Sequence, residues 1–175
     1  MQIPRARAAA CAAALAAAAC SPALDWRELR PEGSGAVLML PCKPASHARR
    51  VPLAGTPVEL TLYACSAAGV TWALAFADVA DPARVGPALA ALRDAALANV
   101  GAAASAPLPL AVPGATPNPA SVRLALQGRL PDGQAVHEQV AVFARGTRVY
   151  QATCVGAQLP ADGVQTFFAG LRTPA

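Results

Sequence analysis

Apolar and polar residues alternate along several segments of the chain, and this alternation predicts an antiparallel β-sheet. In residues 58–65 every second side chain is apolar. In residues 70–78, Trp72, Leu74 and Phe76 share one side, while the alanines on the other side leave room for a closely packed helix. A period of two is typical of strands, because successive side chains point to opposite faces. The predicted strands are residues 49–53, 58–65, 70–78, 121–129, 136–144 and 147–155.

Two other segments repeat apolar residues at the three- and four-residue spacing of an amphipathic helix. The longer one starts at Asp81, a favourable N-cap residue, continues through Pro82 at the first helical position and stops at Gly101. Its apolar stripe consists of Val85, Leu89, Leu92, Ala96 and Val100. A shorter helix is predicted over residues 160–171. Its apolar face consists of Val164, Phe167, Phe168 and Leu171.

Three segments fit neither pattern. Residues 36–40 are a continuous apolar run that ends at Pro41, and the length of this run favours a buried strand. Residues 25–31 are short and polar, and they predict either a first edge strand or a tether. Residues 102–120 are rich in proline, so they form an extended loop that crosses the domain. This loop is either a semi-rigid connector or a binding edge.

The order of these elements predicts an α+β fold, in which an antiparallel β-sheet is flanked by a long helix and a C-terminal helix as an α/β/α sandwich. Its landmarks are Leu40-Pro41, Cys65, Asp78, the 128–155 meander and Phe167-Phe168. This order resembles the PsbP-like α/β/α sandwich over about Trp26 to Arg172. The resemblance rests on element order and implies a non-enzymatic accessory or binding protein. No functional residue carries over.

The first twenty residues have the pattern of a secretory signal. Arg5 and Arg7 precede a run of about a dozen apolar residues, which is too short for a membrane-spanning helix. The run ends in Ala17-Ala18-Ala19, directly before Cys20. Small residues directly before a cysteine resemble the lipobox of bacterial lipoproteins, which implies that residues 1–19 are removed and that Cys20 carries lipid. The alternative is an ordinary signal cut that leaves Cys20 unmodified.

The lipobox resemblance also implies a location and domain boundaries. Ser21 stands where an aspartate would favour the inner membrane, so we expect an outer-membrane lipoprotein that faces the periplasm. Several acyl chains anchor a protein stably, and the membrane is therefore the expected partner, with an envelope protein as a further one. Residues 20–30 are expected to be the lipidated N-terminus and tether, and residues 31–175 a single domain.

The charge of the chain argues against nucleic acid as a partner. The formal net charge of +4 falls to +2 without residues 1–19, which contain two arginines and no acid. The other arginines are spread along the chain without a basic block or a basic–aromatic motif.

The chain has five cysteines, and Cys11 is expected to be removed with the signal. The mature chain then keeps three besides Cys20, namely Cys42, Cys65 and Cys154. A disulfide is expected in an oxidising compartment, and Cys42 and Cys65 flank the predicted hairpin closely enough to meet. Their bridge closes a loop of about 24 residues and stabilises the fold by roughly 3 kcal/mol. Cys154 is then a buried apolar thiol. A Cys65–Cys154 bridge is the alternative.

An envelope metal-binding protein is the alternative function. Cys42, His47 and Cys65 would supply the ligands, with His137 or Cys154 as the fourth. A Cys42–Cys65 disulfide would rule this out. No other cofactor is expected.

We do not expect an enzyme. The chain has two histidines and no Gly-x-Ser-x-Gly, Walker or Rossmann glycine pattern. Asp81, Asp132 and Asp162 are explained as cap, turn and helix-start residues. His137 and Glu138 are neighbours on a predicted strand, so their side chains point to opposite faces and cannot act as a pair. The expected role is binding or assembly at the cell envelope.

Overall fold

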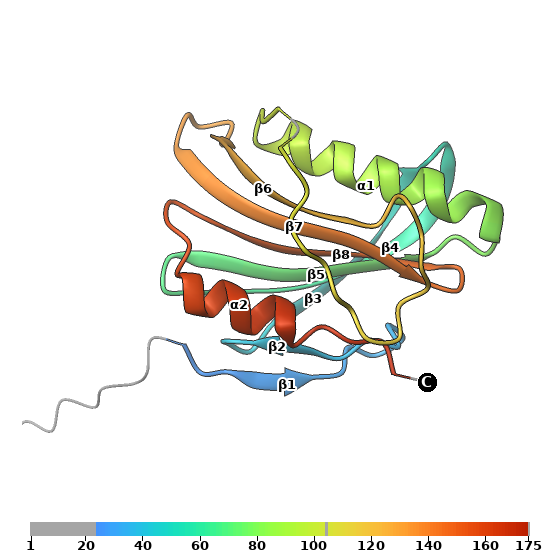
Figure 1. Ribbon diagram of the computed structural model, residues 1–175, viewed down its shortest axis with the longest axis horizontal. Coiled ribbons are helices and arrows are strands. Elements are labelled where there is room, and N and C mark those ends of the chain that lie inside the picture. The colour runs from blue at the N-terminus through green and yellow to red at the C-terminus, as the bar shows by residue number, and fades with distance from the viewer. Residues whose placement is uncertain (1–23, 104, 175) are drawn as a thin grey trace, which may run out of the picture.

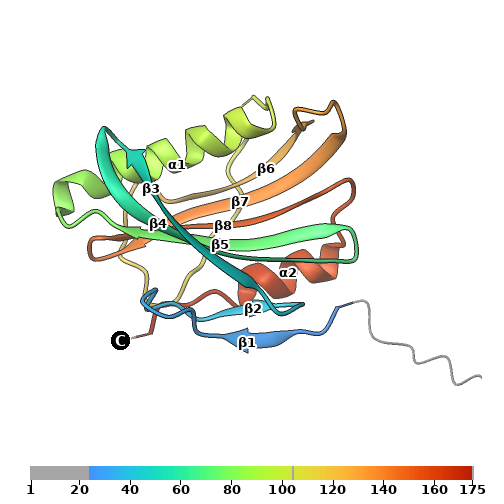
Figure 2. The same ribbon diagram turned by 180° about the vertical axis from the view of Figure 1, so that it is seen from behind.

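The structure, a computed structural model, describes residues 24–103 and 105–174. Six antiparallel strands form one sheet in the order β3-β4-β5-β8-β7-β6 (Figure 1). The strands are β3 (Ala45–Leu53), β4 (Thr56–Ala67), β5 (Val70–Asp78), β6 (Val122–Arg129), β7 (Ala135–Arg145) and β8 (Arg148–Gly156). Helix α1 (Val85–Asn99) lies across one face and helix α2 (Ala161–Ala169) against the other (Figures 1 and 2). The predicted α+β class is confirmed.

Two three-stranded meanders meet at the centre of the sheet, where β5 pairs with β8. Within the first meander, Ala54 and Gly55 turn the chain with φ angles of 48° and 78°, a geometry that suits the twist of a hairpin. The turn is shorter than the predicted 54–57, because Thr56 and Pro57 belong to β4. Pro57 is tolerated there because β5 does not extend along this part of β4.

The face under α1 has an aliphatic core. The predicted stripe of α1 is at most 5% exposed, so this prediction is confirmed. A 3-10 turn, η1 (Pro82–Arg84), precedes the helix, and the Asp81 carboxylate accepts a hydrogen bond from the amide of Ala83 at 2.9 Å. The strand residues beneath the helix include Leu124, Leu126, Val136, Val140, Val142 and Val149.

Helix α1 packs mainly over β7 and β8, and of the β5 alanines only Ala77 belongs to its core. Its C-terminal end is held at β6, where the carbonyl of Val100 accepts a hydrogen bond from the amide of Arg129 at 2.8 Å. A side chain at Gly128 would collide with that carbonyl. Beside the helix, Ala73 and Ala75 line open hollows. The prediction of close helix packing is therefore wrong for Ala73 and Ala75 and confirmed for Ala77.

The opposite face has an aromatic core. Phe143 stacks on Tyr150 with ring centroids 4.9 Å apart, and Trp72 meets Phe167 of α2 edge to face at 5.5 Å. The Tyr150 hydroxyl donates a hydrogen bond to the carbonyl of Ser34 at 2.6 Å. These buried rings fill the space between the sheet and α2, and they fix α2 in place.

Two short strands, β1 (Arg27–Leu29) and β2 (Leu38–Leu40), form a separate antiparallel sheet that lies below the six-stranded sheet and α2 in Figure 1. β2 contains buried residues as predicted, but it is not part of the six-stranded sheet. Trp26 packs edge to face on Trp72 at 5.4 Å. Of the two alternatives for residues 25–31, the structure shows the strand, because Arg27–Leu29 pair with β2.

The proline-rich loop crosses the aromatic face, as predicted (Figure 1). The side chains that pack on the aromatic core are Leu110, Val112 and Ala115. Short β-bridges fasten the loop to β6 and β7. At Gly114, which has a φ of 82°, the carbonyl of Thr173 approaches so closely that a Cβ would lie 1.9 Å from its oxygen. The loop thereby also holds the C-terminal segment.

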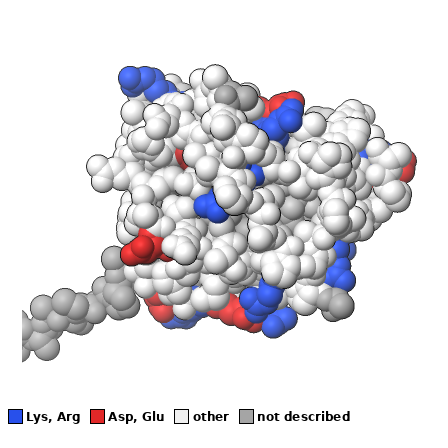
Figure 3. Space-filling model, viewed as in Figure 1, with Lys and Arg blue, Asp and Glu red and all other residues white. Residues whose placement is uncertain are grey.

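Charged side chains are sparse over α2 and gather along the edge formed by β1 (Figure 3). At this edge, ion pairs join Arg27 to Asp25 and Glu28 to both Arg30 and Arg172. Exposed pairs of this kind contribute little to stability. The α2 face is therefore mainly an uncharged surface.

Among the described residues, no helix is long and apolar enough to cross a membrane.

Candidate functional site

The cysteines predicted as site residues have different fates. Cys20 lies outside the described residues. Cys42 and Cys65 are joined in a disulfide, with their Cα atoms 5.9 Å apart, which ties the segment after β2 to β4. Cys154 is buried in β8, and burial raises the pKa of its thiol to about 12, so the thiol stays protonated at neutral pH. A protonated, buried thiol is a packing residue and not a nucleophile.

The metal site considered from the sequence is not formed by its three ligands. The disulfide uses the thiols of Cys42 and Cys65. His47 of β3 lines the α1 side of the sheet, whereas Cys65 packs against the aromatic core on the other side. Across residues 24–103 and 105–174, no group of three His, Cys, Asp or Glu is placed to hold an ion. The predicted ligand set is therefore wrong.

The two adjacent residues of β7 with acid–base side chains point to opposite faces, as predicted. His137 is exposed, while Glu138 is 5% exposed and lies on the α1 side. In the described chain, neither His47 nor His137 has a hydrogen bond to an acid or a hydroxyl group that would form a catalytic pair.

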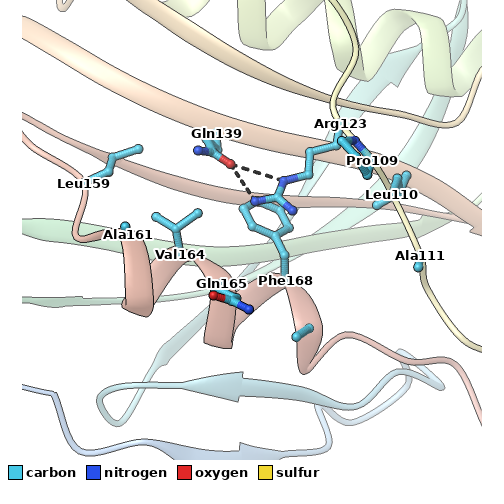
Figure 4. Close-up of a pocket in the computed structure, with 11 residues that line it drawn as sticks. Pro109, Leu110, Ala111, Arg123, Gln139, Leu159, Ala161, Val164, Gln165 and Phe168 are labelled. Atoms are coloured by element: carbon cyan, nitrogen blue, oxygen red, sulfur yellow. Dashed lines mark hydrogen bonds between the residues drawn. The ribbon is translucent and has the colours of Figure 1, made fainter.

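A pocket of about 480 Å³ opens between α2, β6, β7 and the proline-rich loop (Figure 4). We call it the Arg123 pocket. It is lined by Pro109, Leu110, Ala111, Arg123, Gln139, Leu159, Ala161, Val164, Gln165, Phe168 and Ala169. Arg123 is the one charged residue among these, and most of the others are apolar. Such a lining, with a few polar groups in an apolar wall, is typical of small-ligand sites.

Arg123 is held in position from two sides (Figure 4). Its Nε and Nη2 atoms both donate hydrogen bonds to the Oε1 atom of Gln139, at 3.2 and 2.7 Å. Its Cζ atom lies 3.8 Å from the centre of the Phe168 ring, which is a cation–π contact. The guanidinium plane is therefore fixed before any ligand arrives, while Nη1 makes no hydrogen bond among the described residues.

No carboxylate of the described residues compensates the charge of Arg123. The ion pairs of the described chain involve Arg27, Arg30, Arg93, Arg148 and Arg172, and none of them involves Arg123. Partial burial lowers the pKa of Arg123 from its ordinary value, because desolvation disfavours the cation. An arginine nevertheless stays protonated in proteins. The pocket therefore contains a fixed positive charge with no acid beside it.

A second hollow lies on the other face, between α1 and strands β3, β4 and β5. This α1 groove has a volume of about 570 Å³, and most of its lining side chains are apolar. The apolar lining includes Val51, Leu53, Leu60, Leu62, Ala75 and Leu92. A smaller inner pocket of about 220 Å³ adjoins it near the end of α1, and the two share Leu62, Ala75, Asn99 and Gln151. Glu138 is the charged residue of the inner pocket.

Sequence reasoning missed both Arg123 and Glu138, although each had a signal. Glu138 interrupts the apolar alternation of Val136, Val140 and Val142, and an acid in the buried register of a strand is unusual. Arg123 had a weaker signal, because one arginine on a strand is ordinary until the residues across from it are known. Only the packing of α2 and the proline-rich loop encloses it.

A comparison with models of protein families finds no match for this chain, and a search of curated proteins finds no similar sequence.

Proposed function

We propose that the protein is a non-enzymatic binding protein of the bacterial cell envelope, anchored by lipid at Cys20 and facing the periplasm from the outer membrane. We propose that its ligand is an anion with an apolar part, held in the Arg123 pocket. The observation that carries this proposal is the fixed guanidinium without an acid partner in a mainly apolar pocket. A carboxylate or phosphate group would neutralise that charge, and charge-assisted hydrogen bonds to arginine are strong.

The polar groups that remain free match an anionic head group. Gln139 uses Oε1 for Arg123, so its amide NH₂ is available to a second acceptor. Val164 and Leu159 line the pocket beside these polar groups and suit an apolar tail. A ligand would thus meet donors at the Arg123 end of the pocket and hydrocarbon along the rest.

The proposed anchor is short, and it joins the domain on the same side as the Arg123 pocket. The side chain of Leu24 lies against Gly163 in the first turn of α2, and that turn borders the Arg123 pocket. Four residue steps separate Cys20 from Leu24, which is a reach of at most about 14 Å. A lipid on Cys20 would therefore keep the pocket close to the membrane surface.

Calorimetric titration with sodium octanoate tests the ligand class, with octanol as the uncharged control. We expect Arg123→Gln to weaken octanoate binding at least about tenfold, because it removes a charged hydrogen-bond partner. Arg129→Gln is the matched control, since Arg129 lies exposed on the same strand and its side chain bonds only the carbonyl of Gly133. Equal octanoate affinity of the wild type and Arg123→Gln would refute the anion site, provided that both variants unfold at similar temperatures.

The anchor is tested separately by the intact mass of protein extracted from membranes. We expect a mature chain that begins at Cys20 and carries acyl chains, and a Cys20→Ser variant that is not acylated. A mass without lipid would refute the anchor and leave the ligand site untouched.

We also propose that the domain is a PsbP-like sandwich. The observed sheet between α1 and α2 supports this, together with the element order described above. Superposition of an experimental structure on PsbP-like domains tests it, and a different strand order in those domains would refute it.

A further inference from the structure

Glu138 is buried within the aliphatic core of the α1 face. On β7 it lies opposite Leu126 of β6 and Val155 of β8, and its α1-side neighbours on β7 are Val136 and Val140. The residue is 5% exposed. A carboxyl group in such surroundings costs free energy unless a partner compensates it.

No partner for this carboxyl group is present among the described residues. Glu138 takes part in none of the side-chain hydrogen bonds or ion pairs. Some polar side-chain atoms are inaccessible to solvent and also lack a hydrogen-bond partner, and the oxygens of Glu138 are not among them. The carboxyl group therefore reaches open space, and the inner pocket that it lines provides that space. An unpartnered acid that opens into a pocket indicates a site for a complementary group.

The groups that face Glu138 are neutral. From β6, β8, α1 and the loop after β6 they are Leu126, Thr153, Val155, Asn99 and Leu130. His137 is adjacent in sequence but points to the opposite face. Burial raises the pKa of Glu138 to about 7, and desolvation is the sole cause. The free protein therefore contains a mixture of protonated and ionised Glu138 at neutral pH.

The two ends of the combined hollow differ in charge. The inner end has Glu138 and the C-terminal end of α1, where the helix dipole is negative. The outer end has His47 and Arg49 of β3. Both inner features favour a cation, while Arg49 repels one. Between the ends, the groove is lined by the apolar side chains of Leu60 and Leu62.

We propose that the α1 groove binds an apolar molecule that carries an ammonium group, with the ammonium paired to Glu138 in the inner pocket. The apolar part of this molecule lies along the groove between α1 and β4. When Glu138 is protonated in the free protein, binding releases that proton to solvent and leaves a carboxylate–ammonium pair. This site is on the opposite face from the Arg123 pocket and does not depend on the function proposed above.

The test uses octylammonium chloride as the probe and octanol as its uncharged counterpart, both titrated by calorimetry into the unlabelled protein. We expect Glu138→Gln to weaken octylammonium binding at least about tenfold and to leave octanol binding unchanged. Glu59→Gln is the matched control, because Glu59 is an exposed acid on β4 that lines neither hollow. Arg123→Gln is also expected to leave octylammonium binding unchanged, which separates this site from the anion site.

A second measurement follows the pH dependence of affinity. An octylammonium ion stays charged across this range, as a lysine side chain does. Its affinity for the wild type is therefore expected to rise about tenfold from pH 6 to pH 8, in step with the ionised fraction of Glu138, and to stay flat in Glu138→Gln. Equal binding of octylammonium by Glu138→Gln and the wild type would overturn the proposal. So would wild-type affinity that is no greater for octylammonium than for octanol, or no binding up to about 10 mM.

Discussion

The two faces of the sheet are covered in different ways, and each way leaves a different hollow. The aromatic face is covered by three segments: the β1–β2 sheet, the proline-rich loop and α2. The aliphatic face is covered by one helix, which reaches only part of the sheet. The first arrangement encloses a small pocket around a cation, and the second leaves an elongated groove that ends at an acid.

This difference shows how packing creates sites of opposite charge within one small domain. Large rings fill the aromatic face so completely that the Arg123 pocket forms only at its rim, where three segments meet. Small side chains on β5 do not fill the space beside α1, so the groove lies next to the core itself. A substitution should therefore affect stability strongly on the aromatic face and weakly in the groove.

The largest expected effect tests this difference in stability between the two faces. Trp72 is fully buried, so Trp72→Ala is expected to lower the unfolding free energy by about 3–5 kcal/mol. Leu60 lines the groove and is only partly buried, so Leu60→Ala is expected to cost only about 1 kcal/mol. Urea denaturation measures both values. Trp72→Phe is the control, because it keeps a ring and removes an indole N–H that has no hydrogen-bond partner. Similar losses for Trp72→Ala and Leu60→Ala would contradict the contrast.

The disulfide lies on the aromatic face, so its loss should also lower the unfolding free energy clearly. The bridged cysteines are separated by 23 positions in sequence. Replacing both Cys42 and Cys65 with alanine is expected to cost about 3 kcal/mol, because the unfolded chain gains conformational freedom. Thermal unfolding with and without a reductant checks this. The reductant should destabilise the wild type and leave the double variant unchanged, and an insensitive wild type would show that the bridge is absent.

Glu138, on the aliphatic face, makes the unfolding free energy of the protein depend on pH. The pKa of Glu138 is about 7 in the folded protein, against 4.5 for an ordinary glutamate such as that of the unfolded chain. Between these two pH values the folded protein keeps a proton that the unfolded chain has lost. The unfolding free energy should therefore fall as pH rises from about 4.5, by about 3 kcal/mol in total, and level off above about pH 7. Denaturation at several pH values checks this. Glu138→Gln should remove the decline, and a decline that persists in this variant would have another cause.

The smallest expected effect concerns the 3-10 turn η1, which Asp81 caps and which leads into α1 on the aliphatic face. Asp81→Ala removes the hydrogen bond to the amide of Ala83 and should cost about 1 kcal/mol. Asp94→Ala on the exposed side of the same helix is the control, since its ion pair with Arg93 is exposed and should contribute little. Chemical denaturation distinguishes the two, and equal effects would argue that the Asp81 cap of η1 does not stabilise the fold.

Much of the fold could be predicted from local pattern. The alternation over β4 and β5 and the stripe of α1 each depend on residues close in sequence, and each is confirmed. The position of β2 could not be predicted, because an apolar run indicates burial without indicating which layer buries it. The position of the C-terminal end of α1 on the sheet involves the contact between Gly128 and Val100, which are distant in sequence.

The candidate sites depended even more on distant contacts. The paired cysteines Cys42 and Cys65 could be suggested from their places beside one hairpin, and the structure joins them. Arg123 becomes a site only because α2 brings Phe168 beneath it and β7 presents Gln139. Glu138 carried a sequence signal, but whether a partner lay opposite it depended on β6, β8 and α1.

The sequence by itself determined the elements, their buried faces and the expected signal before Cys20, because periodicity and composition act over a few neighbouring residues. Only the tertiary structure decided which face each helix covers, how far it covers it, and which charges remain without a partner. The physical reason is that a charge is compensated, or left alone, by whatever packs against it, and those groups come from parts of the chain that local pattern does not connect.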